Sequence, residues 1–312
     1  MNPNPRARTL PQQAFFFSLC TSLCWLLGLL FTPATALALD LWQEKTRLDA
    51  LRPVLPAREL VELQIPARPP LPALYRKTRR ADTQGAAIIL HPPGQHLDYP
   101  GPVHELRRRL PRFGWTTLSL QMPELHINRA DAPLDEALQE SSARLRAAVN
   151  FLNRESIQNI VIIGQGLSAS YAVAFVTETA LANPSVQALV TIGWPSYPQR
   201  AAWLDASRQL ERLKLPLLDL YAELDRDEVL ADLPRRLEAA HLAGQLFDQP
   251  LRLTDVSSRV QSLARRKTGN LRYRQMEIQG SDAFFRNQSD TLVKLIRGWI
   301  QRYAAGIQAT IE

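Results

Sequence analysis

"VIIGQGLSAS", residues 161–170, is the stretch that indicates the fold of this chain. It ends a mostly apolar run, "NIVIIG" (159–164), which is typical of a strand buried on both faces of a sheet. Gly164 and Gly166 form a turn, and a helical pattern over 167–183 begins at once. A strand, a glycine-rich turn and a helix in direct succession predict the carboxyl end of a strand in an α/β protein.

The rest of the chain repeats this alternation. Apolar runs predict eight strands, at 60–65, 72–78, 86–91, 115–123, 159–164, 186–194, 215–224 and 271–280. Helical spacing predicts helices at 40–59, 103–114, 133–155, 167–183, 228–246 and 288–303, with a mixed segment over 195–214. Strands alternating with helices predict an α/β fold, with a mostly parallel central sheet of about eight strands and helices on both faces.

The first 38 residues have the pattern of a signal peptide. Arg6 and Arg8 precede an apolar run over 14–31, and two small-x-small sites end at Ala36 and Ala38. We therefore expect export to the periplasm and a mature chain that begins between Leu37 and Leu39. A membrane anchor is the alternative, because the run is about as long as the shortest spans.

The remaining chain divides by pattern into two parts. Residues 39–82 are expected to form an N-terminal helix and strand segment that packs on a main domain over 83–305. Both cysteines lie in the first 38 residues. The exported chain is thus expected to have neither a disulfide nor a thiol nucleophile.

The net charge of +7 comes from scattered arginines. An exported protein has little opportunity to meet nucleic acid, so no nucleic-acid partner is expected. We expect a solvated basic face, and the alternative is weak attraction to an anionic membrane surface. The expected partner is an unknown small molecule or an envelope protein.

The glycine-rich turn also matches a dinucleotide fingerprint, since Gly164 to Ala169 read G-x-G-x-x-A. That fingerprint usually opens the first strand–helix unit, whereas four predicted strands precede this one. It also needs an acid at the end of the next strand, which here ends "TIGWP". No nicotinamide or other cofactor is therefore expected.

The glycine-rich turn can also be interpreted as a nucleophile elbow, whose usual pattern is Gly-x-Ser-x-Gly. "GAAIILHPPGQHLDYPGPVHELRRRLPRFGWTTLSLQMP", "GQGLSA" and "GSDAFFRNQSDTLVKLIRGWI" together resemble a bacterial family of exported α/β-hydrolase-like proteins of unknown function. The resemblance covers most of residues 40–305. It implies an α/β-hydrolase-like fold and no established activity.

The resemblance also implies where a catalytic triad would stand. The nucleophile position holds Gly166, the acid position after the seventh strand holds Asp225, and the histidine position after the last strand holds Ala283. A triad needs a nucleophile, a base and an orienting acid, and two of these are absent. Gly166 is expected to adopt the strained backbone geometry of the elbow.

Ser168 stands two residues beyond the elbow position. A helical side chain there points roughly 200° away, so a packing role is expected instead of catalysis. The only nearby bases, His91 and His96, belong to the loop after the third strand, and with His104 they match no known metal-ligand spacing. No metal is expected.

The sequence therefore predicts a binding cleft without catalytic residues. Free N–H groups at the start of the helix after Gly166, with open space over that glycine, would suit an anion or a polar head group. The candidate binding residues are His91, Gly94, Gln95, His96, Gly166, Leu167, Ser168 and Asp225. A hydrolase of esters or acyl groups with an unconventional nucleophile is the alternative.

Overall fold

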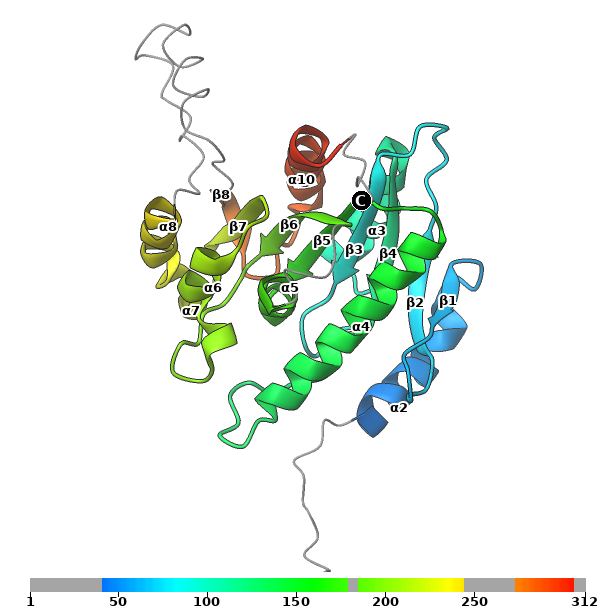
Figure 1. The fold of residues 1–312 in the computed structure, drawn as a ribbon, viewed down its shortest axis with the longest axis horizontal. Helices are drawn as coiled ribbons and strands as arrows, with labels where there is room; N and C mark the ends of the chain where they lie inside the picture. The colour runs from blue at the N-terminus through cyan, green and yellow to red at the C-terminus, as the bar shows by residue number, and fades with distance from the viewer. Residues whose placement is uncertain (1–40, 179–184, 244–272, 306–312) are drawn as a thin grey trace, which may run out of the picture. The chain divides into compact units, whose positions relative to one another are not determined.

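The computed structural model describes residues 41–178, 185–243 and 273–305 (Figure 1). The chain divides after Ala38, and every described helix and strand belongs to the second unit, Leu39–Glu312. The predicted signal peptide, residues 1–38, lies outside the described residues.

The described strands form one eight-stranded sheet, which confirms the predicted fold class. Their order is β1-β2-β4-β3-β5-β6-β7-β8. β2 pairs antiparallel with β1 and β4, and every neighbouring pair from β4 to β8 is parallel. The strands are β1 Leu60–Leu63, β2 Leu71–Arg76, β3 Gly85–Leu90, β4 Trp115–Leu120, β5 Ile160–Gln165, β6 Val186–Ile192, β7 Leu217–Leu224 and β8 Tyr273–Asp282.

The helices fall close to their predicted places, with two differences. The described helices are α2 Leu41–Leu51, α3 Pro102–Arg109, α4 Leu134–Arg154, α5 Leu167–Glu178, α6 Ala206–Arg212, α7 Asp227–Leu230, α8 Leu233–Leu242 and α10 Ser289–Tyr303. The helix predicted over 40–59 ends at Leu51, and Pro53 lies in a 3-10 turn that follows. The helix predicted over 228–246 is two helices, because Pro234 occupies the first turn of α8, where its missing N–H is not needed.

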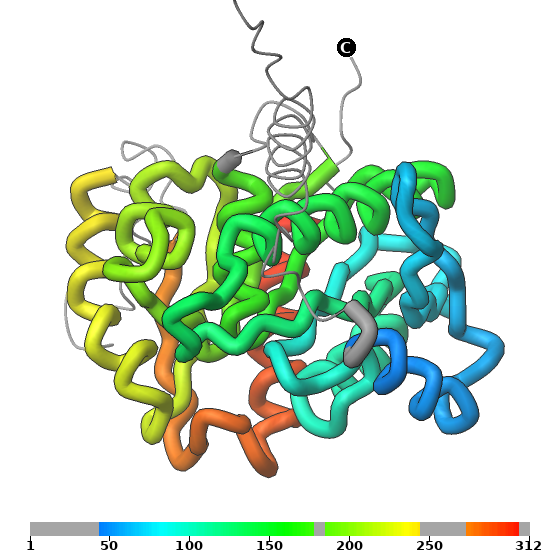
Figure 2. Tube along the Cα trace, turned by 90° about the horizontal axis from the view of Figure 1, so that it is seen from below, coloured from blue at the N-terminus to red at the C-terminus, as the bar shows by residue number. Residues whose placement is uncertain are grey.

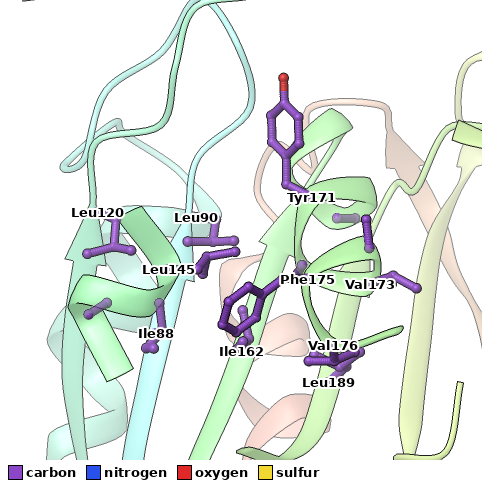
Figure 3. Packing of buried hydrophobic residues seen from close by; sticks show 14 of the residues in the cluster. Ile88, Leu90, Leu120, Leu145, Ile162, Tyr171, Val173, Phe175, Val176 and Leu189 are labelled. Carbon is purple, nitrogen blue, oxygen red and sulfur yellow. The ribbon is translucent and has the colours of Figure 1, made fainter. Parts of the chain in front are cut away.

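Two helical layers cover the sheet (Figure 2). Successive residues of a strand point to opposite faces. Ile88 and Ile162 therefore pack in one core with Leu145 of α4 and Phe175 of α5 (Figure 3). Their neighbours on β3 and β5 pack on the other face in a core with α3 and α10. This burial on both faces explains why the central strands read as continuous apolar runs.

α2 is tied to the rest of the unit by buried ion pairs. Arg144 of α4 donates to both carboxylate oxygens of Glu44, at 2.5 and 3.0 Å, and to Glu140 at 2.7 Å. Arg47 pairs with Glu124 in the connection after β4. Removing one member of such a buried pair leaves an uncompensated charge, so these contacts fix α2 in place.

Across the described ranges, we find no helix with both the length and the apolar composition that crossing a bilayer requires.

Candidate functional site

The carboxyl ends of the parallel strands bring the predicted site residues to one edge of the sheet. The loop after β3 contains His91 to His96, and the turn after β5 contains Gly166. Asp225 follows β7 and Ala283 follows β8. This is the edge at which ligands bind in open α/β sheets.

Gly166 has the backbone conformation predicted for an elbow. Its φ is +58°, in the left-handed region that favours glycine, and its N–H donates to the carbonyl of Ile192 at 2.9 Å. α5 starts at the next residue, Leu167. The strand, the strained turn and the helix thus have the arrangement of a nucleophile elbow with no side chain at its apex.

The space over Gly166 is not open, contrary to the expectation from the sequence. A Cβ placed on Gly166 would lie 3.0 Å from Cβ of Pro92 and 3.5 Å from Nη2 of Arg226. The loop after β3 therefore closes over the elbow from one side, and an arginine from the start of α7 approaches from another. This contact could not be predicted from the sequence, because Pro92 and Arg226 are far from Gly166 along the chain.

Ser168 is a packing residue, as predicted, and because it is fully buried its place among the candidate binding residues was wrong. Its side chain is fully buried, and Oγ donates to the carbonyl oxygen of His91 at 2.5 Å. A hydroxyl committed to a backbone carbonyl inside the protein is poorly placed to attack a substrate. The same contact holds the loop after β3 against α5.

His91 is part of the core and does not face a cleft. It is fully buried, its Nδ1–H donates to the carbonyl of Pro92 at 2.8 Å, and Nε2 accepts the N–H of Met122 at 2.9 Å. Burial lowers the pKa of His91 to about 4. Both ring nitrogens are already used, so His91 can serve neither as a base nor as a ligand contact.

The start of the loop after β3, residues 92–94, offers no free N–H to an oxyanion. Pro92 and Pro93 have no N–H, and the N–H of Gly94 donates to Oε2 of Glu124 at 3.1 Å. An oxyanion hole needs one N–H from the residue after the nucleophile and another from this loop. Leu167 offers the first, but these three residues of the loop offer no second.

Gln95 and His96 lie in the same loop. Oε1 of Gln95 is buried and has no hydrogen-bond partner among the described residues. Nδ1 of His96 accepts the N–H of Asp98 at 3.3 Å, and partial burial lowers the pKa of His96. Its ring packs edge to face against the ring of Tyr99.

Asp225 stands at the predicted acid position, but it has no base to orient. Its two carboxylate oxygens accept the N–H groups of Ala222 at 3.0 Å and Arg226 at 2.9 Å, and burial raises its pKa. Oδ2 of Asp225 and Cε2 of Phe285 both lie within 3.5 Å of the point where a Cβ on Gly193 would stand. The carboxylate and the aromatic ring thus both border Gly193.

Phe285 was not predicted as a site residue. It follows Ala283 by two positions, is buried, and has a φ of +54°. The pair Phe284-Phe285 in the sequence was the available signal. Within the described part of the chain, no three histidine, cysteine or carboxylate side chains gather as metal ligands would.

Comparisons with known proteins identify the family and the fold of the chain. The model of a family described as proteins of unknown function (DUF3530) matches residues 34–137 and 127–250. No curated protein sequence matches the chain.

Solved structures share the fold at low sequence identity. The esterase domain of a Rhodothermus marinus protein is 16% identical, with a TM-score of 0.53 over 79% of this chain and 98% of that one. A dienelactone hydrolase from Anabaena variabilis is 15% identical, with a TM-score of 0.51 over 78% and 97%. A lidless α/β serine hydrolase from Xanthomonas campestris is 15% identical, with a TM-score of 0.52 over 80% and 96%. These likenesses establish an α/β-hydrolase-like fold.

Proposed function

The chain belongs to the DUF3530 family of proteins of unknown function, and we propose that it is a non-catalytic protein of the α/β-hydrolase fold that binds a ligand or a partner in the bacterial envelope. The observation that best supports this proposal is the structure of the turn at Gly166. Gly166 has no nucleophile, and Pro92 stands 3.0 Å from the point that the first side-chain atom of a nucleophile would occupy. The elbow thus has no reactive group, and a side chain placed there would press on Pro92.

The other catalytic roles are also unfilled. Ala283 cannot act as a base, the hydroxyl of Ser168 is committed to His91, and the loop after β3 offers no free N–H between Pro92 and Gly94. Removing one oxyanion donor alone costs about 10²–10³ in rate. With nucleophile, base and one donor missing together, we expect no turnover above background.

A hydrolase with an unconventional nucleophile is the second candidate. Its support is the fold shared with an esterase domain and a dienelactone hydrolase, together with the preserved acid Asp225. Ser168 would be its nucleophile.

The deciding experiment is the turnover of 4-nitrophenyl butyrate by the wild type, Ser168→Ala and the control Ser170→Ala. Ser170 is equally buried in α5, and its Oγ accepts the Nε1–H of Trp194. Our proposal expects three equal, background rates. Ester turnover that is lost in Ser168→Ala and kept in Ser170→Ala, with both variants folded, would establish the hydrolase instead.

Restoring the missing nucleophile and histidine is a second test of the same proposal. Gly166→Ser with Ala283→His is expected to do little, because Pro92 crowds the new side chain. Adding Pro92→Gly removes that contact and supplies an N–H, so the triple variant is expected to gain activity that neither the double variant nor Pro92→Gly alone shows. If the double variant gained as much activity over the wild type as the triple variant, this would show that Pro92 does not block a side chain at residue 166.

The envelope location rests on the signal-peptide pattern of residues 1–38. N-terminal sequencing of protein recovered from the periplasm is expected to start between Leu37 and Leu39. Recovery of membrane-bound protein that still begins at Met1 would favour an anchor.

A further inference from the structure

A groove that shares no residue with the elbow lies between the β1–β2 connection and α4. The groove is open to solvent and has a volume of about 740 Å³, which is room enough for a small molecule to lie along its floor. The connection supplies residues 64–69, and α4 supplies Asn150 and Arg154. Figure 1 shows α4 lying across the sheet next to the strands β1 and β2.

The polar lining of this groove is cationic. Arg68 and Arg154 are its charged residues, and no aspartate or glutamate lines it. Arg68 pairs with Glu140. Among the described residues, Arg154 forms no ion pair, and its exposed guanidinium is therefore available to a carboxylate or phosphate, which it matches in shape.

The remaining polar residues, Gln64 and Asn150, carry amide groups that can donate further hydrogen bonds to an anion. Both are exposed and lie on opposite walls of the groove, one on the connection and one on α4. An anionic group held by Arg154 thus has neutral donors within the same groove.

The apolar lining is stiff. Ile65 is buried, and Pro66 and Pro69 follow it on the connection. Between the prolines, Ala67 has a φ of +59°, a left-handed conformation that residues other than glycine rarely adopt. Such outliers cluster at ligand sites, and the fixed φ of each proline keeps the groove pre-formed.

We propose that this groove binds a small amphiphilic anion, a carboxylate or phosphate monoester attached to a short hydrocarbon chain. The anionic group pairs with Arg154, and the hydrocarbon lies against Ile65 and the two prolines. The site is separate from the elbow, so it stands whether or not the chain is catalytic.

The test measures the binding of small anions to the full purified protein. Hexyl phosphate and hexanoate are the ligands, which separates a phosphate from a carboxylate. Inorganic phosphate lacks the chain and hexanol lacks the charge. We expect calorimetry to detect hexyl phosphate, hexanoate or both, and to show weaker binding of inorganic phosphate and hexanol.

Matched arginine variants assign the site. Arg154→Gln is expected to weaken binding of the anion by at least about fivefold, because a charge-assisted bidentate contact is lost. Arg146→Gln changes another exposed arginine of α4 that does not line the groove, and it is expected to leave affinity unchanged. Both positions are exposed, so both variants should fold.

Amide chemical shifts supply an independent readout, with changes expected at Ala67 and Asn150. Each of three results would overturn the proposal: no binding of either anion, equal loss in the two arginine variants, or binding of hexanol as tight as that of the anions. Binding of inorganic phosphate as tight as that of hexyl phosphate would also refute the role of the apolar wall.

Discussion

Replacing Gly164 by alanine is expected to destabilise the protein severely, although the change adds only one methyl group. A Cβ on Gly164 would lie 2.7 Å from Cα of Ala169 and 2.7 Å from the carbonyl oxygen of Ser168. Both are backbone atoms of α5, so neither can turn aside as a side chain would. The methyl group can be accommodated only if α5 moves away from β5.

The size of the effect follows from the contact distances. Ordinary van der Waals contact starts near 3.4 Å, so α5 must retreat by 3.4 − 2.7 = 0.7 Å. Overpacking of a core costs about 1–3 kcal/mol, and the upper end applies because a whole helix has to move. Gly166→Ala is expected to cost about 1–2 kcal/mol, the penalty of a left-handed alanine, with some addition from Pro92.

Gly298→Ala is the matched control. Gly298 lies inside α10, and a Cβ there would meet nothing within 4 Å. Alanine at such a helical position is expected to stabilise the protein by about 0.5–1 kcal/mol.

Urea unfolding followed by tryptophan fluorescence gives the free energy of unfolding of each variant. The expected order of stability is Gly298→Ala, wild type, Gly166→Ala and then Gly164→Ala. A Gly164→Ala variant as stable as the wild type, or more stable than Gly166→Ala, would refute the close approach of β5 and α5 and with it the elbow.

Three further effects are expected. Gln165→Met should raise the free energy of unfolding by about 1 kcal/mol in urea titrations, since Oε1 of Gln165 is buried with no partner in the described ranges. Arg236→Met should lower it by about 3–5 kcal/mol, because Arg236 and Asp219 are fully buried and pair at 3.0 Å; adding Asp219→Leu should restore part of the loss. The free energy of unfolding should fall by about 3 kcal/mol as the pH drops from about 6.5 to about 4, because His91 binds a proton over this range in the unfolded chain, whereas buried His91, with its pKa of about 4, stays neutral in the folded protein. His91→Gln should flatten this part of the pH profile.

The local features of the elbow could be predicted from the sequence. The apolar run of β5, the turn at Gly166 and the start of α5 are adjacent in the chain, and their order is decided by side-chain patterning and by the conformational freedom of glycine. The parallel sheet followed from the same patterning, since strands buried on both faces read differently from strands with one wet face.

The contents of the site could not be predicted in this way. Pro92, Arg226 and Phe285 come from three separate loops, and their places depend on how those loops fold over the sheet edge. A resemblance in the sequence identifies the residues at the triad positions and says nothing of which side chains from other loops pack around them. The open space expected over Gly166 was wrong for this reason: Pro92 and Arg226 lie close to the point that a Cβ of Gly166 would occupy.

The shared carboxylate of Glu124 has a mechanical consequence. One of its oxygens pairs with Arg47 of α2, and the other accepts the N–H of Gly94, two residues after Pro92. Tension applied to the chain ahead of α2 would be borne by the pairs Arg47–Glu124 and Glu44–Arg144 and by the packing of Leu48 with Leu74 of β2. Because Glu124 also accepts the N–H of Gly94, a pull on Arg47 would act on the loop over Gly166.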